Sequence, residues 1–343
     1  MKSFLLLLTV VGISVSSSYA QEQQTIKLSD ALYPKVEWHG LVQVWFTGSD
    51  DTTDQFKLRR GELQIKGALS ESLDFFVMVD PAKSLFENKS VAGTIIRQAK
   101  KDASILQDLG LTVKLPHDLK VTFGQFKRPI GLEGLQISSS QLELMERAII
   151  SRELADKRDI GVRAEGNVAP LKLQYVVGFL NGEGPNTGDT NDQKDVAGML
   201  ILKPVEDLRL FVSAYEGTQG IQNGAQRREG IGSEFRHGPF TLRGEYLRAK
   251  DVNAKKDGWY VLGAYRLRDL GIETLNPVRV AARYEEWDAN RSDVLEIHMV
   301  TVGAQYLLDE KENNKLSLDY FYSDGKGSEE DDQGIFFGFQ GKF

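Results

Sequence analysis

Four of the strands predicted from the sequence share one small charged pattern, an arginine followed two residues later by a glutamate. The four segments are Arg60-Gly-Glu62, Arg163-Ala-Glu165, Arg243-Gly-Glu245 and Arg283-Tyr-Glu285. In an extended strand, residues i and i+2 lie on one face, so each pair presents both charges on the same side. Arginine stays charged and offers a planar fork of donors to phosphate or carboxylate oxygens. The pattern therefore predicts either a path for small anions or ion pairs that stiffen a wall.

Strands that could position these pairs follow one another along most of the chain. Alternation with period two predicts sixteen strands, most of about ten residues, the length that a tilted strand needs to cross a membrane. Short connections alternate with longer polar ones, among them 81–104, 127–158 and 181–194. Short turns on one side and long loops on the other are typical of outer-membrane barrels. We therefore predict an all-β fold, a transmembrane antiparallel up-and-down barrel. The predicted strands begin near residues 36, 55, 72, 105, 118, 159, 171, 195, 206, 228, 239, 257, 277, 293, 314 and 333.

The charged pairs should face the lumen, because a charged pair is costly in lipid. In 277–288, for example, Val280 and Tyr284 alternate with Arg283 and Glu285. The basic residues predicted to line an anion path are Arg60, Lys127, Arg128, Arg147, Arg163, Arg209, Arg243, Arg266, Arg279 and Arg283, and their predicted acidic partners in the lumen are Glu62, Glu165, Glu245 and Glu285.

The two ends of the chain carry further signals. Lys2, a twelve-residue apolar run and a small-residue site ending at Ala20 predict a cleaved signal peptide over residues 1–20. We expect a periplasmic segment over 21–35 and the barrel over 36–343. In GIFFGFQGKF at the end, Ile335, Phe337 and Phe339 share a face with Phe343, which suits a last strand against lipid. The terminal Phe343 resembles the signal that outer-membrane assembly machinery reads on its barrel clients.

Composition limits the alternatives. The chain has no cysteine, and loss of residues 1–20 would change the formal net charge from −7 to −8, so nucleic acid is an unfavourable partner. We find no nucleotide-binding or hydrolase motif, and we predict neither enzyme activity, cofactor nor metal site. His298 and Glu296 could form a catalytic base pair in an outer-membrane hydrolase, but a solvated pair in the lumen is favoured.

Two stretches carry a family resemblance. FGQFKRPIGLEGLQISSSQLELMERAIISRELADKRDIGVRAEG, residues 123–166, and FKLRRGELQIKG, residues 56–67, resemble the phosphate-selective porin O/P family. The resemblance implies a 16-stranded outer-membrane barrel, usually trimeric, with a third long loop that folds inward and basic residues that guide anions.

The connection 127–158 is the longest, and a long loop in a tight architecture is usually functional. Ser138 followed by helix formers predicts a short helix within SSSQLELMER, residues 138–147. The loop holds six basic and five acidic residues, which gives only a small basic surplus. We predict a homotrimeric porin for small hydrophilic solutes, with anions preferred. The alternatives are a plugged, partner-binding barrel, as a third class a hydrolase, and as a fourth and least favoured class a soluble secreted barrel.

Overall fold

The computed structural model describes residues 33–50, 52–83, 86–91, 94–99, 105–222, 224–252, 254–291, 296–326 and 331–343. The predicted signal peptide, 1–20, and residues 21–32 of the predicted periplasmic segment lie outside this set, so both assignments remain predictions. Among the described residues, helices are short, and none is both long and apolar enough to span a membrane.

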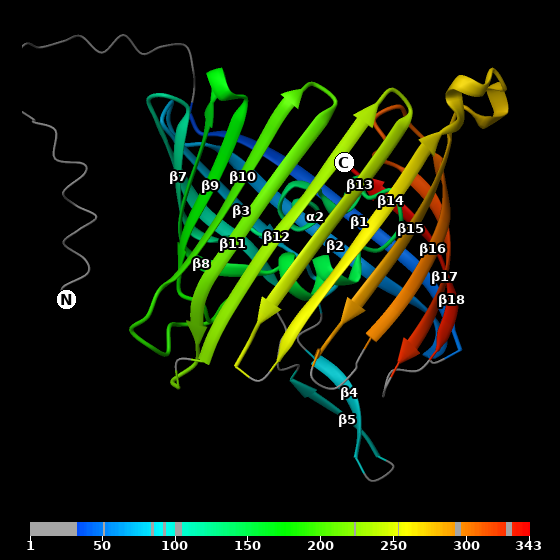
Figure 1. Ribbon diagram of the computed structural model, residues 1–343, viewed down its shortest axis with the longest axis horizontal. Coiled ribbons are helices and arrows are strands. Elements are labelled where there is room, and N and C mark those ends of the chain that lie inside the picture. Colours follow the sequence, from blue (N-terminus) through cyan, green and yellow to red (C-terminus); the bar gives the residue numbers. More distant parts are fainter. Residues whose placement is uncertain are drawn as a thin grey trace, which may run out of the picture. The chain divides into compact units, whose positions relative to one another are not determined.

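Sixteen of the described strands form a closed antiparallel barrel, as the alternation predicts (Figure 1). Each strand pairs with its neighbours along the chain, and β18 closes the ring on β1. The predicted fold class, a closed antiparallel β-barrel, is therefore confirmed. The barrel strands are β1 (Lys35–Ser49), β2 (Thr52–Ala68), β3 (Leu73–Val79), β6 (Leu106–Leu115), β7 (Leu119–Lys127), β8 (Arg158–Val168), β9 (Leu173–Leu180), β10 (Asp195–Val205), β11 (Leu208–Gln219), β12 (Gly224–His237), β13 (Phe240–Lys250), β14 (Lys255–Arg266), β15 (Val278–Asp288), β16 (Glu296–Leu307), β17 (Lys315–Lys326) and β18 (Asp332–Lys342).

A second, two-stranded sheet pairs β4 (Phe86–Val91) with β5 (Thr94–Ala99). The sequence analysis treats 81–104 as one long polar connection, so this hairpin is an addition to the predicted fold. Short 3-10 turns lie in two other connections: η3 (Ala169–Leu171) between β8 and β9, and η4 (Leu267–Leu270) with η5 (Glu273–Leu275) between β14 and β15.

Side chains alternate between the two faces of the barrel wall. On β15, Val280 and Tyr284 are exposed on the outer face, whereas Arg283 and Glu285 are buried inside. The same alternation puts Ile335, Phe337 and Phe339 of β18 on the outer face with Val42 and Val44 of β1. Because the outer face is apolar, the wall suits a lipid environment.

One irregularity changes the alternation on β2. The register between β1 and β2 shifts between Gln43 and Val44, so that Gln43 pairs with Arg60 and Val44 pairs with Leu58. The extra residue of this β-bulge is Arg59, and the shift lets Arg59 and Arg60 both point into the barrel. Strict alternation would have put one of these two guanidinium groups against lipid.

The connection between β7 and β8 folds into the barrel, as predicted. It contains α2 (Leu132–Gln136), the 3-10 turn η1 (Ser139–Gln141) and the π-helical turn η2 (Ser151–Ala155). Ser138 caps η1 in a capping box with Gln141, but the predicted helix does not continue to Arg147. The predicted short helix is therefore present as this one turn, and the residues after it stay open because wall side chains bind the backbone of Leu142 and Met145. We call residues 128–157 the inward loop.

Candidate functional site

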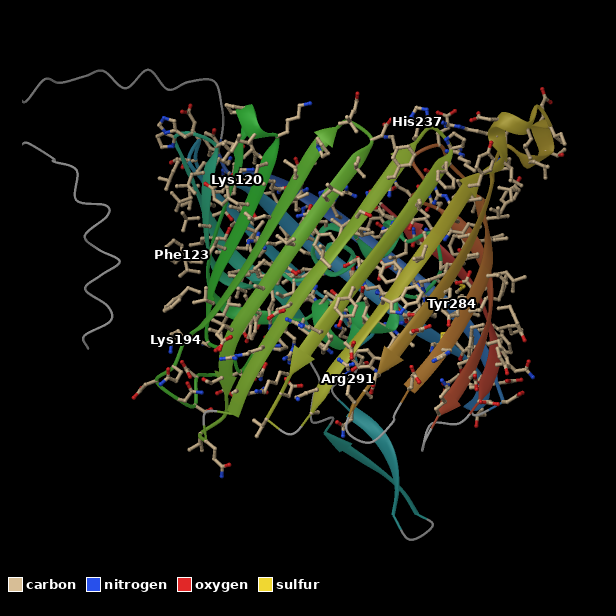
Figure 2. The ribbon with its side chains drawn as sticks, viewed as in Figure 1. Lys120, Phe123, Lys194, His237, Tyr284 and Arg291 are labelled. Carbon is tan, nitrogen blue, oxygen red and sulfur yellow. The ribbon has the colours of Figure 1, made fainter. Side chains whose placement is uncertain are left out.

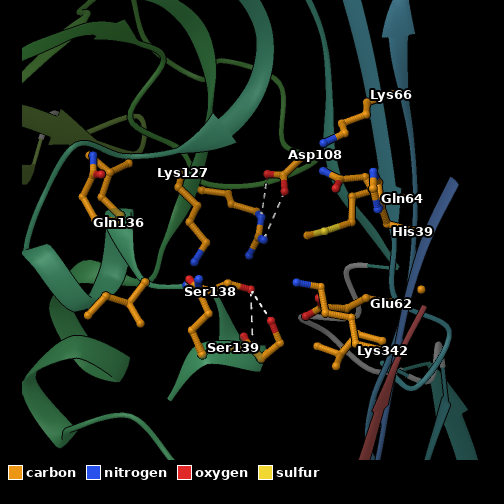
Figure 3. A pocket seen from close by; sticks show the side chains of 18 residues that line it. His39, Glu62, Gln64, Lys66, Asp108, Lys127, Gln136, Ser138, Ser139 and Lys342 are labelled. Atoms are coloured by element: carbon orange, nitrogen blue, oxygen red, sulfur yellow. Dashed lines mark hydrogen bonds and ion pairs between the residues drawn. The ribbon is translucent and has the colours of Figure 1, made fainter. Parts of the chain in front are cut away.

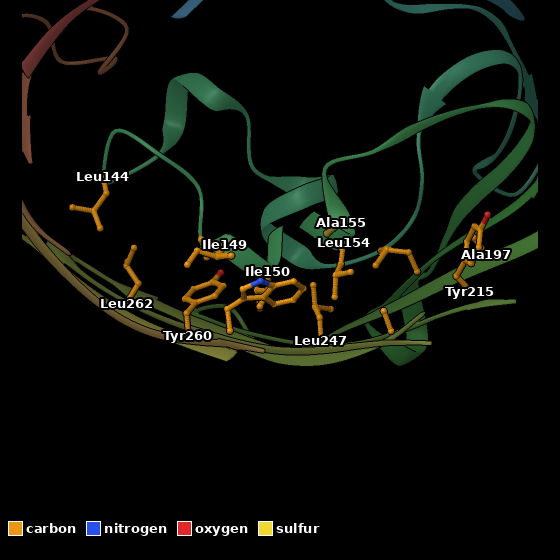
Figure 4. Packing of buried hydrophobic residues seen from close by; sticks show 14 of the residues in the cluster. Leu144, Ile149, Ile150, Leu154, Ala155, Ala197, Tyr215, Leu247, Tyr260 and Leu262 are labelled. Carbon is orange, nitrogen blue, oxygen red and sulfur yellow. The ribbon is translucent and has the colours of Figure 1, made fainter. Parts of the chain in front are cut away.

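An apolar patch on the inner wall holds one side of the inward loop. Leu144, Ile149, Ile150 and Leu154 of the loop pack against wall residues that include Leu247, Tyr260, Leu262 and Trp287 (Figure 4). These wall residues belong to β13, β14 and β15. Leu132 of α2 packs in a second cluster with Met199, Ile201 and Phe211, on β10 and β11. The inner face of such a barrel is usually polar, so these apolar patches help to fix where the loop lies.

Buried carboxylates of the wall bind the loop backbone. Glu245 accepts hydrogen bonds from the N–H groups of Leu132 at 2.8 Å and Glu133 at 2.7 Å, at the start of α2. Glu285 accepts one from the N–H of Ile149 at 2.6 Å. These carboxylates satisfy backbone donors that would otherwise be buried without partners.

Three further strands bind the middle of the loop. Asp319 of β17 accepts a hydrogen bond from the Met145 N–H at 2.6 Å. The Leu142 carbonyl accepts from Lys315 at 2.8 Å and from Gln305 of β16 at 3.0 Å. Gln340 of β18 donates to the Ser140 carbonyl at 3.1 Å. The loop is therefore fixed along its length and not only at its ends.

Arg243 is the centre of a buried ion-pair cluster. Its Nη2 lies 2.8 Å from both carboxylate oxygens of Glu143, and its Nε lies 2.9 Å from Glu234. Glu133 approaches the same guanidinium at 3.5 Å. Burial alone would raise the pKa of the loop residue Glu143. The charges of Arg243 and other cations outweigh burial, so that the pKa of Glu143 lies below its ordinary value. Arg243 therefore neutralises acidic groups of the loop.

Arg147 joins separate turns of the loop to one another. It is buried, and it donates to the carbonyls of Glu133 and of Ile137, the latter at 2.7 Å. Its Nε lies 3.3 Å from Asp156, near the far end of the loop. Arg147 thus binds backbone and carboxylate within the loop, and its side chain does not reach an open surface.

Glu146 connects the loop to the bulge on β2. Arg59 donates to Glu146 from Nε at 3.0 Å and from Nη2 at 2.7 Å, and Arg60 lies 3.5 Å away. Burial raises the pKa of Glu146, but the charges of Arg59, Arg60 and Arg152 outweigh burial and lower this pKa to about 2. Glu146 is therefore ionised, and it ties the loop to the wall opposite the apolar patch.

The basic residues predicted to line an anion path fall into two groups that differ in burial. Arg60, Arg147, Arg243 and Arg283 are buried in contacts with the loop. The remaining six keep some exposure. Their partners are Asp156 for Lys127, Asp159 for Arg128, Glu165 for Arg163, Glu234 for Arg209 and Glu312 for both Arg266 and Arg279. The anion path that the sequence assigns to these residues remains a prediction.

The four predicted acidic partners differ as well. Glu62, Glu165 and Glu285 each pair with the arginine two residues earlier, at 3.8, 3.2 and 2.8 Å. Glu245 accepts bonds from the loop backbone and from the Tyr260 hydroxyl instead.

A cavity of about 420 Å³ lies between the inward loop and the wall formed by β1, β2, β3 and β6. It extends from Lys127 and Arg158 toward Lys66 and Lys342, which lie near the short-turn ends of β2 and β18 (Figure 3). The acidic residues of its lining are Glu62 and Asp108. With His39 neutral, these charges sum to two positive units. We call this space the short-turn cavity.

The basic residues of the short-turn cavity are not equally available to a solute. Arg158 donates two hydrogen bonds to Asp108, at 2.8 and 3.2 Å. Lys66 makes a 3.6 Å contact with the exposed Glu37, whereas Lys342 shows no acidic partner among the residues that the structure describes. Sequence reasoning missed Lys66 and Lys342 because the predicted set takes arginines from the strands and basic residues from the connection 127–158, whereas both of these residues are lysines on strands. Their inward register on β2 and β18 is the signal that could have found them.

A second cavity, of about 450 Å³, lies where the loop meets the long-loop ends of β11 to β14. Its basic residues are Arg128, Lys157, Arg228 and Lys256, and its acidic residues are Glu153 and Asp251. We call it the long-loop cavity. Here too the lining carries two more positive than negative charges.

His298 and Glu296 lie 3.2 Å apart, and Glu286 completes a group whose candidate ligand atoms lie within 4.8 Å of one another. Both β16 residues share the face of exposed Val300 and Val302, so the pair lies on the outer surface and not in the lumen. The lumen placement is therefore wrong.

Comparisons with known proteins agree with this architecture. The family model described as phosphate-selective porin O and P matches residues 43–206. Among solved structures, an anion-selective porin from Comamonas acidovorans is similar with a TM-score of 0.64, at 12% identity, covering 90% of this chain and 100% of that one. The trimer form of in-vitro folded OmpT from Vibrio cholerae gives 0.59, at 14% identity, covering 90% and 99%. The outer membrane channel DcaP of Acinetobacter baumannii gives 0.59, at 12% identity, covering 90% and 97%. None of the curated proteins compared matches the chain.

The barrel, the inward loop and these similarities define the class of the protein as an outer-membrane porin, a channel for passive diffusion. The resemblance to the phosphate-selective porin O and P family, based on 56–67 and 123–166, is confirmed by a match over 43–206.

Proposed function

We propose that the channel prefers small anions and that these pass between the inward loop and the wall of β1, β2, β3 and β6. The observation that carries this proposal is the positive surplus of charge in the two cavities beside the loop. Such charges act on a permeating ion through the local field, which is strong where low-dielectric walls exclude water.

The buried ion pairs explain why the acidic residues of the loop need not repel a permeating anion. Glu133, Glu143 and Glu146 are three of the five acidic residues in the connection 127–158, and each pairs with a buried or partly buried arginine. The charges that remain open to a solute belong mainly to the cavity linings. The small surplus of basic over acidic residues in the loop sequence therefore understates the positive charge that an anion would meet beside the loop.

The similar proteins agree with the proposal. One similar structure is described as an anion-selective porin, and the matched family is described as phosphate-selective. A homotrimer is part of the proposal as well, because one similar structure is described as a trimer form. We propose no enzyme activity for the chain.

The refolded protein in a planar bilayer tests the choice between a channel and a plugged barrel. Under a KCl gradient we expect a conducting pore whose zero-current potential has the sign of chloride selectivity. Millimolar phosphate on one side should reduce the chloride current if phosphate occupies the same path. Cation selectivity would contradict the anion preference, and absence of conductance would favour the plugged, partner-binding barrel.

A further inference from the structure

A row of basic side chains crosses the outer face of the barrel at the long-loop ends of β12, β13 and β14. Arg227 pairs in register with Lys250, and Lys250 pairs in register with Lys255. The neighbouring Arg291 donates its backbone N–H to the Lys255 carbonyl at 2.9 Å. We call these four residues the rim row. All four side chains are exposed.

The rim row points away from the lumen. On β13, Leu247 and Ala249 are buried inside, whereas Tyr246, Arg248 and Lys250 alternate with them on the outer face. On β12, Gln226 faces inward and Arg227 faces outward. The rim row therefore has no direct part in the passage of solutes, and the inference does not rest on the proposed anion preference.

The position of the rim row along the strands is just beyond the apolar part of the outer surface. Tyr246 and Trp259 pair in register on the outer face, and Tyr284 lies beside Trp259 with ring centroids 5.4 Å apart. Aromatic residues of this kind mark the membrane interface in outer-membrane barrels. Lys250 and Lys255 lie four residues past Tyr246 and Trp259, roughly 13 Å along the strand. Figure 2 shows Arg291 at the long-loop end, beyond Tyr284.

Few acidic residues offset the rim row. Glu216 pairs with Arg227 at 2.7 Å and Asp257 lies 3.3 Å from Arg291. Lys250 and Lys255 face each other across β13 and β14 and have no acidic partner among the described residues. Like charges directly opposite each other destabilise a sheet, so this pair is unfavourable unless an anion lies between them. A groove of about 260 Å³ lies along the row.

We propose that the rim row binds the phosphate groups of a phosphorylated lipid in the outer leaflet. In outer-membrane barrels the long loops lie on the cell exterior, so the row meets the outer leaflet at its headgroup level. Several cations near an anionic lipid surface attract it together, and guanidinium groups match phosphate oxygens well. A lipid rather than free phosphate is the partner, because the row faces the membrane directly above an aromatic and apolar surface.

The test compares two triple variants that lose equal charge. The rim variant is R227Q/K250Q/K255Q. The control is K120Q/K172Q/K203Q, whose three exposed lysines lie near the short turns. Each protein, folded in detergent, is titrated with a purified bisphosphorylated glucosamine lipid, its dephosphorylated counterpart and inorganic phosphate. Conductance and heat-dependent migration on gels show that each variant is folded.

We expect the rim variant to bind the bisphosphorylated lipid on the order of 100-fold more weakly, since each basic residue near an anionic surface contributes about fivefold. The control should keep wild-type affinity. The proposal is overturned by equal affinity of rim variant and wild type, by equal losses in both variants, or by equally tight binding of the dephosphorylated lipid. Inorganic phosphate that binds the row as tightly as the lipid would identify a free anion as the ligand and also overturn it.

A thermal measurement gives a second, independent outcome. Removal of Lys250 and Lys255 relieves repulsion, so the double variant K250Q/K255Q, which keeps the Arg227–Glu216 pair, should be at least as heat-stable as wild type in lipid-free detergent. The bisphosphorylated lipid should then raise the melting temperature of wild type more than that of the variant. A variant that is less stable without lipid would contradict the uncompensated repulsion on which the inference rests.

Discussion

Nη2 of Arg243 on β13 lies 2.8 Å from both carboxylate oxygens of Glu143 in the inward loop, and both side chains are buried. Two residues that are 100 positions apart in the chain thus join the loop to the wall. Loss of one partner from a buried ion pair leaves the other charge uncompensated, which costs about 3–5 kcal/mol. The loop's position therefore depends on this pair.

R243Q should loosen the inward loop. We expect larger and noisier single-channel currents than in wild type, together with a lower urea midpoint for unfolding. The matched control is R248Q on the same strand, because Arg248 is exposed on the outer face. If R243Q and R248Q have the same conductance and midpoint, the Arg243 cluster does not hold the loop.

The loop should also loosen in acid through Glu146. The pKa of this carboxyl is about 2 in the folded protein, below its ordinary value of 4.5. A depressed pKa stabilises the folded state above the ordinary value, and this stabilisation is lost as the pH falls from 4.5 through 2. Current noise should therefore increase over that range.

E146Q should show at pH 7 the noise that wild type shows in acid, and it should lose that part of the pH dependence. E153Q is the control, because Glu153 is an exposed residue of the same loop. A wild-type pH profile in E146Q would assign the acid response to another group.

Closure of the barrel should depend on the contact between Gly40 and Phe343. Gly40 and Phe343 exchange backbone hydrogen bonds at 2.8 and 3.1 Å. A Cβ at position 40 would lie 2.1 Å from Cζ of Phe343, so G40A must displace the ring. We expect lower refolding yield and a lower temperature for heat-dependent migration on gels.

The control for G40A is G263A, because no atom lies within 4 Å of the position of a Cβ at Gly263. In the double variant G40A/F343A the ring is absent, so G40A should add little to the effect of F343A. Additive effects would show that the ring is not the cause. Refolding in vitro keeps this test separate from the predicted assembly signal at Phe343.

The fold could be predicted because apolar and polar residues alternate within each strand. The sixteen predicted strand starts all correspond to barrel strands, since one face of each strand must be apolar in lipid. The hairpin of β4 and β5 was missed, because 81–104 lacks a clear pattern of this kind. The bulge at Arg59 depends on the pairing of β1 with β2, which a single strand does not reveal.

The contacts of the candidate site were harder to predict than the side of the barrel wall on which each residue lies. Inward register correctly put Arg243 and Arg283 inside the barrel, but it could not show that the loop buries both of them. The same limit applies to the helix predicted after Ser138. Local propensity favours helix beyond the turn that Ser138 caps, whereas Asp319, Lys315 and Gln305, distant in sequence, bind the backbone after Gln141 in an open form.

The most direct test of the anion preference is the zero-current potential of K66Q/K342Q in a planar bilayer under a KCl gradient. This variant removes two positive charges from the short-turn cavity without touching a contact that holds the loop. R227Q/K255Q, on the outer face, removes the same charge as a control. The account predicts a potential that shifts from the anion-selective side toward zero or beyond in K66Q/K342Q alone. An unchanged potential in K66Q/K342Q, or an equal shift in both variants, would contradict it.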